Sequence, residues 1–273
     1  MDILNEFDCD ELHYRYALDE SPKEADYAFH VHDKCEIFYF VSGGAQYLVE
    51  GSVYPLERGT LLIMMPNEAH CPQILSDEQY ERFAVNFPLS LFDSIDSERR
   101  LMSPFTKRLF GRENMYTLPG LETVFEKMGE GADMYEKKLN LTTSLLSLLT
   151  IIRSAFLGKE KEKMRIQTPA ESIVSYVNEH LYEEITIDSL CSRFFVSSSK
   201  LQRMFKHSTG ASVWEFITAK RLAAVRGMLS NGMPAGEASQ KCGFGDYSSF
   251  YRAYVKRYKE TPSEKHVKKE DFS

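Results

Sequence analysis

The sequence has few cysteines and no long apolar run. Its cysteines are odd in number, are scattered and form no C-x-x-C pair, which argues against a disulfide framework or a structural zinc knuckle. The first eleven residues are acidic and lack the basic start and apolar stretch of a secretion signal. The longest apolar-rich run, Leu145–Ile152, is far shorter than the ~20 residues that a membrane helix needs. We therefore expect a cytoplasmic protein that spans no membrane. The cysteines are Cys9, Cys35, Cys71, Cys191 and Cys242.

Charge is unevenly distributed along the 273 residues. The net charge of −7 by itself does not favour nucleic acid as a partner. Residues 1–164 contain 17 Lys+Arg and 28 Asp+Glu, whereas residues 165–273 contain 16 Lys+Arg and 12 Asp+Glu. This split indicates an acidic module joined to a weakly basic one that can approach DNA. The length is enough for about two domains of roughly 100–200 residues each.

Short β-rich segments dominate residues from about 26 to 88. Ser42-Gly43-Gly44 separates two of them and is a hairpin signal. Many short strands with closely spaced turns predict a small barrel or sandwich. The predicted strands are Glu36–Val41, Ala45–Glu50, Thr60–Met64 and Arg82–Phe87.

Helical periodicity replaces the β pattern at residues 121–157. Apolar residues there fall mostly at three- and four-residue spacings and form a stripe. A helix packed on its own barrel and a helix that mediates dimerisation explain this stripe equally well. The charged run Gly158–Lys163 has no apolar anchor and predicts a linker. The stripe consists of Leu139, Leu145, Leu146, Leu149 and Ile152.

Several helix starts are visible from Thr168 onward. Thr168, followed by Pro169 and Glu171, has the form of a capping box with proline at the first helical position. Thr186 and Ser197 can cap two further helices separated by a short break. Two short helices joined by a tight turn are typical of a helix-turn-helix that enters the major groove of DNA.

The helix after Ser197 carries side chains suited to reading bases. Leu201, Met204 and Phe205 form its apolar face, and Gln202 and Arg203 point elsewhere. Arginine suits guanine and glutamine suits adenine, each through a pair of hydrogen bonds. We therefore expect this helix to be the one that enters the groove.

The pattern returns when the chain is shifted by 49 residues. Arg203 then maps to Arg252, and Asp246 takes the capping place of Ser197. Ser212–Ser230, between the two copies, predicts a long connecting helix. Two similar units on a rigid spacer can enter successive major grooves, ~34 Å apart. An ordinary helical bundle with solvated arginines does not explain a basic residue at the same helical position twice.

Residues 170–266 resemble the DNA-binding domain of the AraC/XylS family of transcription regulators. Residues 185–190, 197–206, 243–246 and 261–264 carry most of the resemblance. It implies that one group of side chains faces bases or phosphates in one groove and a second group does so in the next. These are Ser199, Lys200, Gln202 and Arg203 in the first groove, and Tyr247, Ser248, Tyr251 and Arg252 in the second.

The second unit departs from the family pattern at four positions. Ala235 and Ala238 stand where the family prefers larger aliphatic residues, and Val225 replaces a usual alanine. Lys259 replaces a usual glycine. These departures predict a less tightly packed second unit that contributes more to affinity than to specificity.

The N-terminal segment resembles cupin domains in the spacing of its histidines. His30, His32 and Glu36, followed by Gly43, fit the first cupin motif, H-x-H-x3-E-x6-G, and His70 resembles the histidine of the second. Three imidazoles and a carboxylate can bind a divalent transition metal. In cupin enzymes such a set holds catalytic iron, manganese or zinc.

Three interpretations of these histidines stay open. They bind a metal, they line a metal-free pocket for a small organic effector, as in sensor cupins joined to this DNA-binding domain, or they are hydrogen-bonded inside a barrel. Period-two alternation puts His30 and His32 on one strand face. The predicted effector pocket consists of His30, His32, Glu36, Phe38, Phe40 and His70, and the candidate metal ligands are His30, His32, Glu36 and His70.

The sequence therefore predicts an α+β multidomain protein. It has a cupin-like β-barrel that senses an effector at residues 1–110, a helical linker and dimerisation segment at 111–164, and an all-α DNA-binding domain with two helix-turn-helix units at 165–273. The expected function is sequence-specific transcription regulation rather than catalysis, controlled by a small molecule that family analogy suggests is a sugar or sugar derivative. The expected partners are double-stranded DNA, this effector, a second copy of the chain and RNA polymerase, with no required cofactor. The alternatives are a metal-dependent cupin enzyme with an appended helical domain and an interaction module that kept the fold but does not bind DNA.

Overall fold

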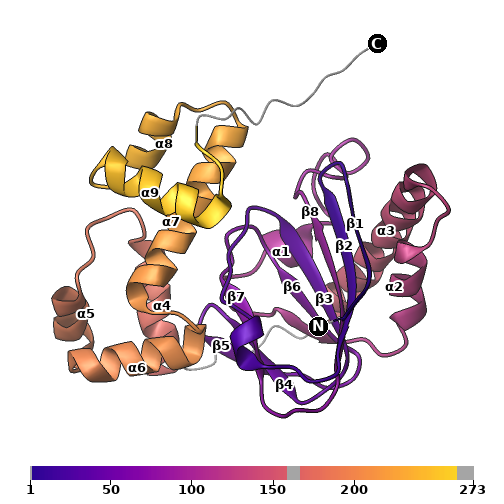
Figure 1. Ribbon diagram of the computed structural model, residues 1–273, viewed down its shortest axis with the longest axis horizontal. Helices are drawn as coiled ribbons and strands as arrows, with labels where there is room; N and C mark the ends of the chain where they lie inside the picture. Colours follow the sequence, from indigo (N-terminus) through magenta and orange to yellow (C-terminus); the bar gives the residue numbers. More distant parts are fainter. Residues whose placement is uncertain (1, 159–166, 263–273) are drawn as a thin grey trace.

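The computed structural model describes residues 2–158 and 167–262, which form two packed units side by side (Figure 1). The first unit is a β-sandwich backed by helices, and the second is entirely helical. This arrangement confirms the predicted α+β multidomain class. Most of the predicted charged linker, residues 159–163, lies outside the described residues.

Two antiparallel sheets build the first unit. The larger has the strand order β1-β2-β8-β3-β6-β9, and the smaller has the order β5-β4-β7. The strands are β1 Asp2–Cys9, β2 Leu12–Asp19, β3 Cys35–Ser42, β4 Ala45–Val49, β5 Ser52–Pro55, β6 Thr60–Met64, β7 His70–Ile74, β8 Tyr80–Phe87 and β9 Met115–Thr117.

The four predicted strands coincide with β3, β4, β6 and β8 to within two residues at each end. The prediction missed β1, β2, β5, β7 and β9, although β2 contains a usable signal. Leu12 and Tyr14 are buried in the core of the unit, whereas His13 and Arg15 alternate with them and line a cavity on the other face. The predicted strand through His30 and His32 is wrong, because His30 forms only an isolated bridge, with His70.

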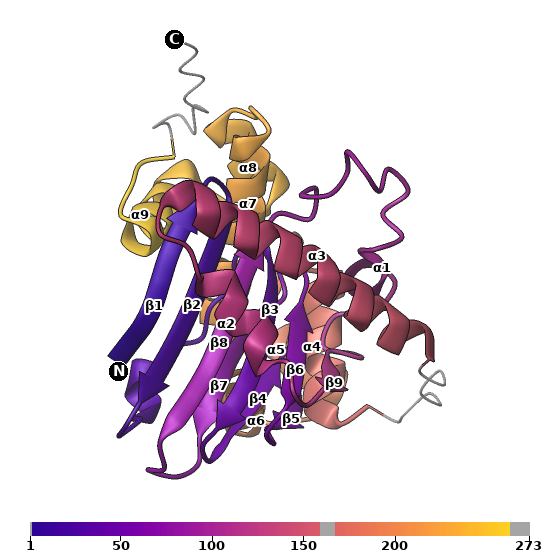
Figure 2. The same cartoon turned by 90° about the vertical axis from the view of Figure 1, so that its right-hand side faces the viewer.

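Alternation along the large sheet separates two apolar clusters. On β3, Ile37 and Tyr39 belong to the cluster on one face, and Phe38 and Phe40 belong to the cluster on the other. Three helices contribute to the first cluster (Figure 2), and the small sheet contributes to the second. The helices are α1 Ser103–Thr106, α2 Glu122–Gly129 and α3 Met134–Gly158.

Helix α3 packs on its own sheet. Leu145, Leu149 and Ile152 are fully buried in the first cluster, whereas Leu139 is 50% exposed. β9 also pairs with β6, so the predicted boundary at residue 110 divides a single packed unit that extends to Gly158. By length and composition alone, α3 is the one helix in the described residues that could cross a membrane, but its buried face belongs to the core.

Two helix-turn-helix units and a connecting helix form the second unit. The predicted N-caps at Thr168, Thr186, Ser197 and Asp246 are confirmed, because each side chain accepts a backbone hydrogen bond from the first turn of its helix. The first pair is α5–α6, the second is α8–α9, and α7 contacts both. The helices are α4 Pro169–Glu179, α5 Ile187–Phe194, α6 Ser198–Thr209, α7 Val213–Ser230, α8 Ala235–Lys241 and α9 Tyr247–Tyr258.

The 49-residue repeat also holds at the ends of these helices. Gly210 after α6 and Lys259 after α9 occupy equivalent places, and both have left-handed backbone conformations, with φ of 77° and 59°. This conformation suits glycine and strains lysine. Val225 and Ala238, which depart from the family pattern, are fully buried in a cluster with Phe250 and are accommodated there.

A buried ion pair joins the two units. Lys220 on α7 lies 2.5 Å from an oxygen of Glu50, in the turn between β4 and β5, and both side chains are at most 2% exposed. The second carboxylate oxygen of Glu50 accepts a hydrogen bond from Asn178 on α4 at 2.7 Å. Nearby, Ser52 donates a hydrogen bond to Glu171 at 2.9 Å. Glu50 and Ser52 of the first unit thus gain polar partners from the docked second unit.

Lys220→Met is expected to lower the free energy of unfolding by about 3–5 kcal/mol, because Glu50 then stays buried without its cation. Adding Glu50→Gln should recover part of this loss, since the uncompensated charge disappears. Urea denaturation of the full chain measures both effects. Lys241→Met is the matched control, because Lys241 and Glu237 form an exposed pair, and it should change stability by less than about 1 kcal/mol. Equal losses for Lys220→Met and Lys241→Met would contradict the argument.

Candidate functional site

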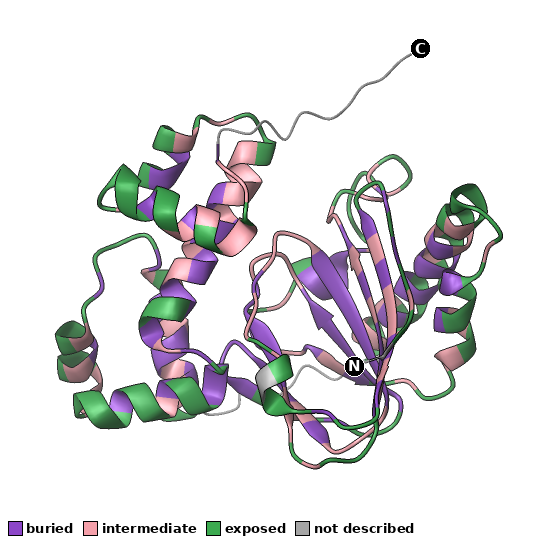
Figure 3. Cartoon of the chain, viewed as in Figure 1, coloured by how far each residue is buried: buried purple, intermediate pink, exposed green. Residues whose placement is uncertain are grey.

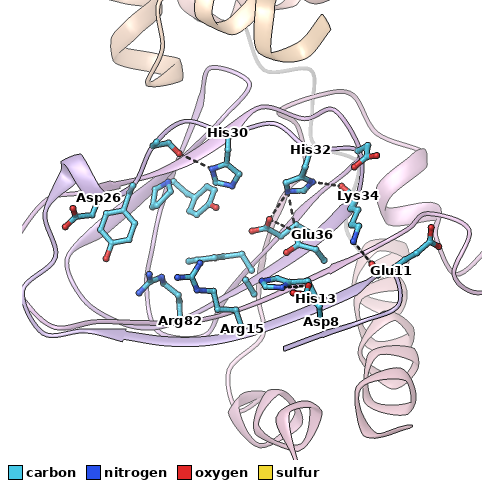
Figure 4. Close-up of a pocket in the computed structure, with 18 of the residues that line it drawn as sticks. Asp8, Glu11, His13, Arg15, Asp26, His30, His32, Lys34, Glu36 and Arg82 are labelled. Carbon is cyan, nitrogen blue, oxygen red and sulfur yellow. Dashed lines mark hydrogen bonds and ion pairs between the residues drawn. The ribbon is translucent and has the colours of Figure 1, made fainter. Parts of the chain in front are cut away.

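A cavity of about 650 Å³ opens beside the large sheet of the first unit (Figure 4). Its floor is the inner face of that sheet, where β2 contributes Arg15 and β8 contributes Arg82, Ala84 and Asn86. The small side chain of Ala84 leaves space at the centre of this floor. Arg226 and Ser230, at the end of α7, complete the lining from the second unit.

The structure brings most of the predicted pocket residues together. His30, His32, Glu36 and Phe38 line the cavity, and His70 is buried directly behind them. Phe40 is placed differently, because it packs in an apolar cluster and is not among the lining residues.

Several lining residues escaped the sequence prediction. The guanidinium of Arg82 stacks over the rings of Tyr80 and Tyr27, with 4.4 and 5.2 Å to their centroids. Figure 4 shows Arg82 and Arg15 side by side, across the cavity from His30. Side-chain alternation within the predicted strand at residues 82–87 could have indicated that Arg82 points to one face of the sheet. Tyr27 lies in an irregular segment and had no such signal.

Four side chains from three segments converge on the cavity wall. One ligand-type atom from each of His30, His32, Glu36 and His70 lies within 4.8 Å of the others. The Glu36 carboxylate is 2.9 Å from His32 Nε2 and 3.4 Å from His70 Nε2. Asn86 also donates a hydrogen bond to Glu36 at 2.8 Å. The residues offered as candidate metal ligands are therefore neighbours in space.

The backbone fixes the orientation of all three imidazoles. The Nδ1 atom of His30 lies 3.0 Å from the carbonyl oxygen of Ala28, that of His32 lies 3.0 Å from the carbonyl of Lys34, and that of His70 lies 2.6 Å from the carbonyl of Glu68. Since a carbonyl can only accept, each Nδ1 must carry the hydrogen. The Nε2 atoms are left facing the cluster.

Burial and neighbouring charges shift the pKa values of the cluster. Burial raises the pKa of the Glu36 carboxyl, but His32 and His70 outweigh this effect and hold the pKa well below its usual range. Burial and the neighbouring His70 lower the pKa of His30 to about 3. His70 Nε2 is buried and has no hydrogen bond of acceptable geometry among the described residues. A nitrogen and carboxylate donor set with one unsatisfied buried nitrogen fits a divalent transition metal.

The predicted DNA-contacting residues lie on the surface of the second unit (Figure 3). All eight are exposed, and they divide between the helices α6 and α9. These helices contact α7, whose 18 residues span about 27 Å at 1.5 Å per residue. On α6 they are Ser199, Lys200, Gln202 and Arg203, and on α9 they are Tyr247, Ser248, Tyr251 and Arg252.

A crevice of about 1000 Å³ lies where the two units meet. Arg203 and Lys206 of α6 line it together with Lys256 and Arg257 of α9, opposite Phe29 and its neighbours in the first unit. Part of the basic surface of the helix-turn-helix units therefore faces the first unit when the two are docked.

Two protein-family models match the chain. The model described as an AraC-like ligand binding domain matches residues 13–146. The model described as a helix-turn-helix domain matches residues 190–266. The first match contains nearly all of β2, the strands β3 to β9 and part of α3, and the second begins within α5 and contains α6 to α9.

Similar proteins are named as transcription regulators. The probable transcriptional regulator LumQ of Photobacterium leiognathi is 29% identical over 114 residues, which are 41% of this chain and 45% of that protein. The xylose operon regulatory protein of Escherichia coli K12 is 31% identical over 90 residues, 33% of this chain and 23% of that protein. The chain thus spans under half the length of these two relatives. The transcriptional activator RhaS of Enterobacter sp. strain 638 is 21% identical over 92% of both chains.

Two solved structures are similar to this chain at low sequence identity. ToxT from Vibrio cholerae has a TM-score of 0.42 at 12% identity, covering 93% of this chain and 97% of that one. The DNA-binding domain of AdpA, solved with a target DNA, has a TM-score of 0.34 at 21% identity, covering 35% of this chain and 87% of that one.

The family matches and the named relatives agree with the order of elements. The ligand-binding model matches the unit that contains the cavity, and the helix-turn-helix model matches the helical unit that follows it. The relatives described above are regulators, which counts against the cupin-enzyme alternative. The chain belongs to the AraC/XylS family of transcription regulators.

Proposed function

We propose that this chain regulates transcription by binding a specific DNA sequence through α6 and α9, under the control of a small molecule in the cavity. The observation that carries the proposal is the repeated helix-turn-helix, with all eight predicted contact residues exposed. Gln202 and Arg203 would read bases in one major groove, whereas Lys200 would contact phosphates. The aromatic residues Tyr247 and Tyr251 suit packing and backbone contacts, so the second unit would add affinity more than specificity.

The cavity suits a small polar effector with apolar faces. Its volume of about 650 Å³ falls within the range of typical ligand sites, roughly 300–1,000 Å³. Tyr27, Tyr80 and Phe38 contribute aromatic rings to the lining, the first two stacked against Arg82, and Arg82 and Asn86 offer hydrogen-bond donors. This combination fits a sugar or sugar derivative, and one relative is named for the xylose operon.

Control would pass through the docking of the two units. Arg226 and Ser230 of α7 line the cavity, so a bound effector can touch both units at once. An effector shifts an arrangement only through its different affinity for the alternatives. A molecule that contacts α7 would therefore stabilise the docked arrangement, in which Arg203 faces the crevice.

A second copy of the chain and RNA polymerase complete the proposed set of partners, in the cytoplasm where the DNA lies. The outer face of α3 is the proposed dimer surface. It exposes Leu139, Ile151 and Leu157, at 50, 39 and 61%. Thr150 and Ser154, on the same face, satisfy their hydroxyls on carbonyls of their own helix, so a close helix contact there leaves no hydroxyl unpaired.

Selection of DNA sites from a random library is expected to return one sequence motif, bound in a salt-sensitive way. Arg203→Ala should weaken binding by about 1–3 kcal/mol and relax the preference at one base position. Arg193→Ala is the control, because Arg193 lies on α5 and stacks on Tyr176 at 4.2 Å. The absence of sequence-selective binding at moderate salt would refute the regulatory function.

Ala84→Leu is expected to lower effector affinity at least about tenfold, since it places a larger side chain on the cavity floor. Calorimetric titration with sugars that alter site selection measures the change. Ala132→Leu adds the same bulk at an exposed position and should leave affinity unaltered. Unchanged affinity in Ala84→Leu would show that the effector binds elsewhere.

The chain is expected to sediment as a dimer, and Ile151→Arg should shift it toward monomer by placing a charge in the proposed contact. Leu75→Arg introduces the same charge at an exposed leucine outside α3 and serves as the comparison. A wild-type chain that stays monomeric across the concentration range would rule out this use of α3.

A further inference from the structure

We infer that His30, His32, His70 and Glu36 bind a divalent transition metal ion, and that this ion stabilises the surface on which the DNA-binding unit docks. The metal site stands on the geometry of the cluster alone. Its coupling to docking rests on the proposed regulatory function. Different contacts of the same two short segments support the site and its coupling to docking.

The hydrogen bonds of the imidazoles point to a cation between them. His32 has a carbonyl oxygen at Nδ1, 3.0 Å away, and the Glu36 carboxylate at Nε2, 2.9 Å away. A neutral imidazole has one N–H and cannot donate to both. A proton or a metal ion must therefore lie between His32 and Glu36. His70 repeats the pattern, with Nδ1 on a carbonyl and Nε2 toward the same carboxylate oxygen at 3.4 Å.

A metal ion satisfies more of these atoms than a proton does. A proton can join one nitrogen to the carboxylate, and it leaves the other Nε2 lone pairs facing the cluster. A single ion accepts lone pairs from His30, His32 and His70 together with the Glu36 oxygen. Metal-binding histidines usually donate the hydrogen of their other ring nitrogen to a carbonyl or a carboxylate, as the Nδ1 atoms do here. Three imidazoles and one carboxylate favour zinc, nickel, cobalt or iron over calcium and magnesium.

The two segments that supply the histidines are also the docking surface. His30 and His70 face each other across an antiparallel bridge, with reciprocal backbone hydrogen bonds of 3.0 Å. Neighbours of these ligands turn to the opposite face, where Val31 and Ala69 belong to the apolar core of the second unit. One side of each segment therefore carries ligands, and the other side carries contacts to the DNA-binding unit.

Polar contacts support the same division. Arg257 of α9 donates a hydrogen bond to the carbonyl of Val31 at 3.0 Å. The thiol of Cys71 lies 3.7 Å from the carbonyl of Thr209, at the end of α6. The backbone N–H of Ala69 donates to Glu50, the partner of Lys220, at 2.6 Å. Each contact comes from a residue next to a proposed ligand or at most two positions from one.

The ion would reinforce a segment with little regular structure of its own. His30 forms an isolated bridge, and no strand includes His32. A bond from each histidine to an ion shared with β3 and β7 ties this segment to the sandwich. Metal binding should then favour docking, and docking should raise metal affinity by the same factor.

The first test measures metal binding to the full chain after chelator treatment, with zinc and cobalt salts as probes. Calorimetry is expected to give one ion per chain, and cobalt should give the visible absorption of a low-symmetry nitrogen and oxygen site. His32→Gln should lower affinity by at least about tenfold. His180→Gln is the matched control, since His180 pairs with Glu183 at 3.0 Å as His32 pairs with Glu36, and it should bind as the wild type does.

His30→Gln provides a second ligand variant, and circular dichroism confirms that each variant is folded. Binding of fewer than about 0.2 ions per chain to the folded wild type overturns the site. An equal loss in His180→Gln and His32→Gln also overturns it, because the metal would then bind surface histidines.

The second test measures docking through the alkylation rate of Cys71, which is buried against Thr209 and is followed by peptide mass spectrometry. Zinc should slow this alkylation at least about fivefold in the wild type and have no effect in His32→Gln. Cys71→Ser should still bind zinc, which separates protection by docking from direct ligation by the thiol. Stoichiometric zinc without protection of Cys71 overturns the coupling. Failure of DNA site selection would refute the proposed function and leave the metal stoichiometry standing.

Discussion

Side-chain alternation along extended backbone is the constraint on which this structure depends. In the large sheet it places Ile37 and Tyr39 in the core beneath α3, and it leaves Glu36 and Phe38 for the cavity. At the edge of the cavity the same alternation turns His30 and His32 inward and Val31 toward the DNA-binding unit. Side chains that line the cavity and side chains that contact the DNA-binding unit therefore alternate along the same short segment.

The interface between the units combines apolar contact with buried charge. Val31 and Ala69 extend the apolar core of the first helix-turn-helix, and the pair of Glu50 with Lys220 fixes their relative placement. A buried pair adds little net stability, because desolvation offsets much of its attraction. An interface of this kind is suited to exchange between docked and undocked arrangements.

The two helix-turn-helix units differ in how they are supported. The core of the first includes Val31 and Ala69 of the first unit, whereas the second has its own cluster around Val225, Ala238 and Phe250. Ala238 and Val225 were expected to loosen the second unit, and both are nevertheless fully buried. Lys259 is the clearer departure. It has the left-handed backbone conformation that Gly210 has in the first unit, and this conformation strains a lysine but not a glycine.

Local patterns determined a large part of this protein from the sequence alone. The caps at Thr168 and Ser197, the strand Thr60–Met64 and the repeat that pairs Arg203 with Arg252 depend on neighbouring residues, so sequence spacing predicts them. Only the tertiary structure decided that α3 packs inward, that Arg82 joins the cavity and that His70 meets His30. These outcomes depend on which surfaces bury each other across long separations in the chain, and periodicity within one element carries no information about its partner.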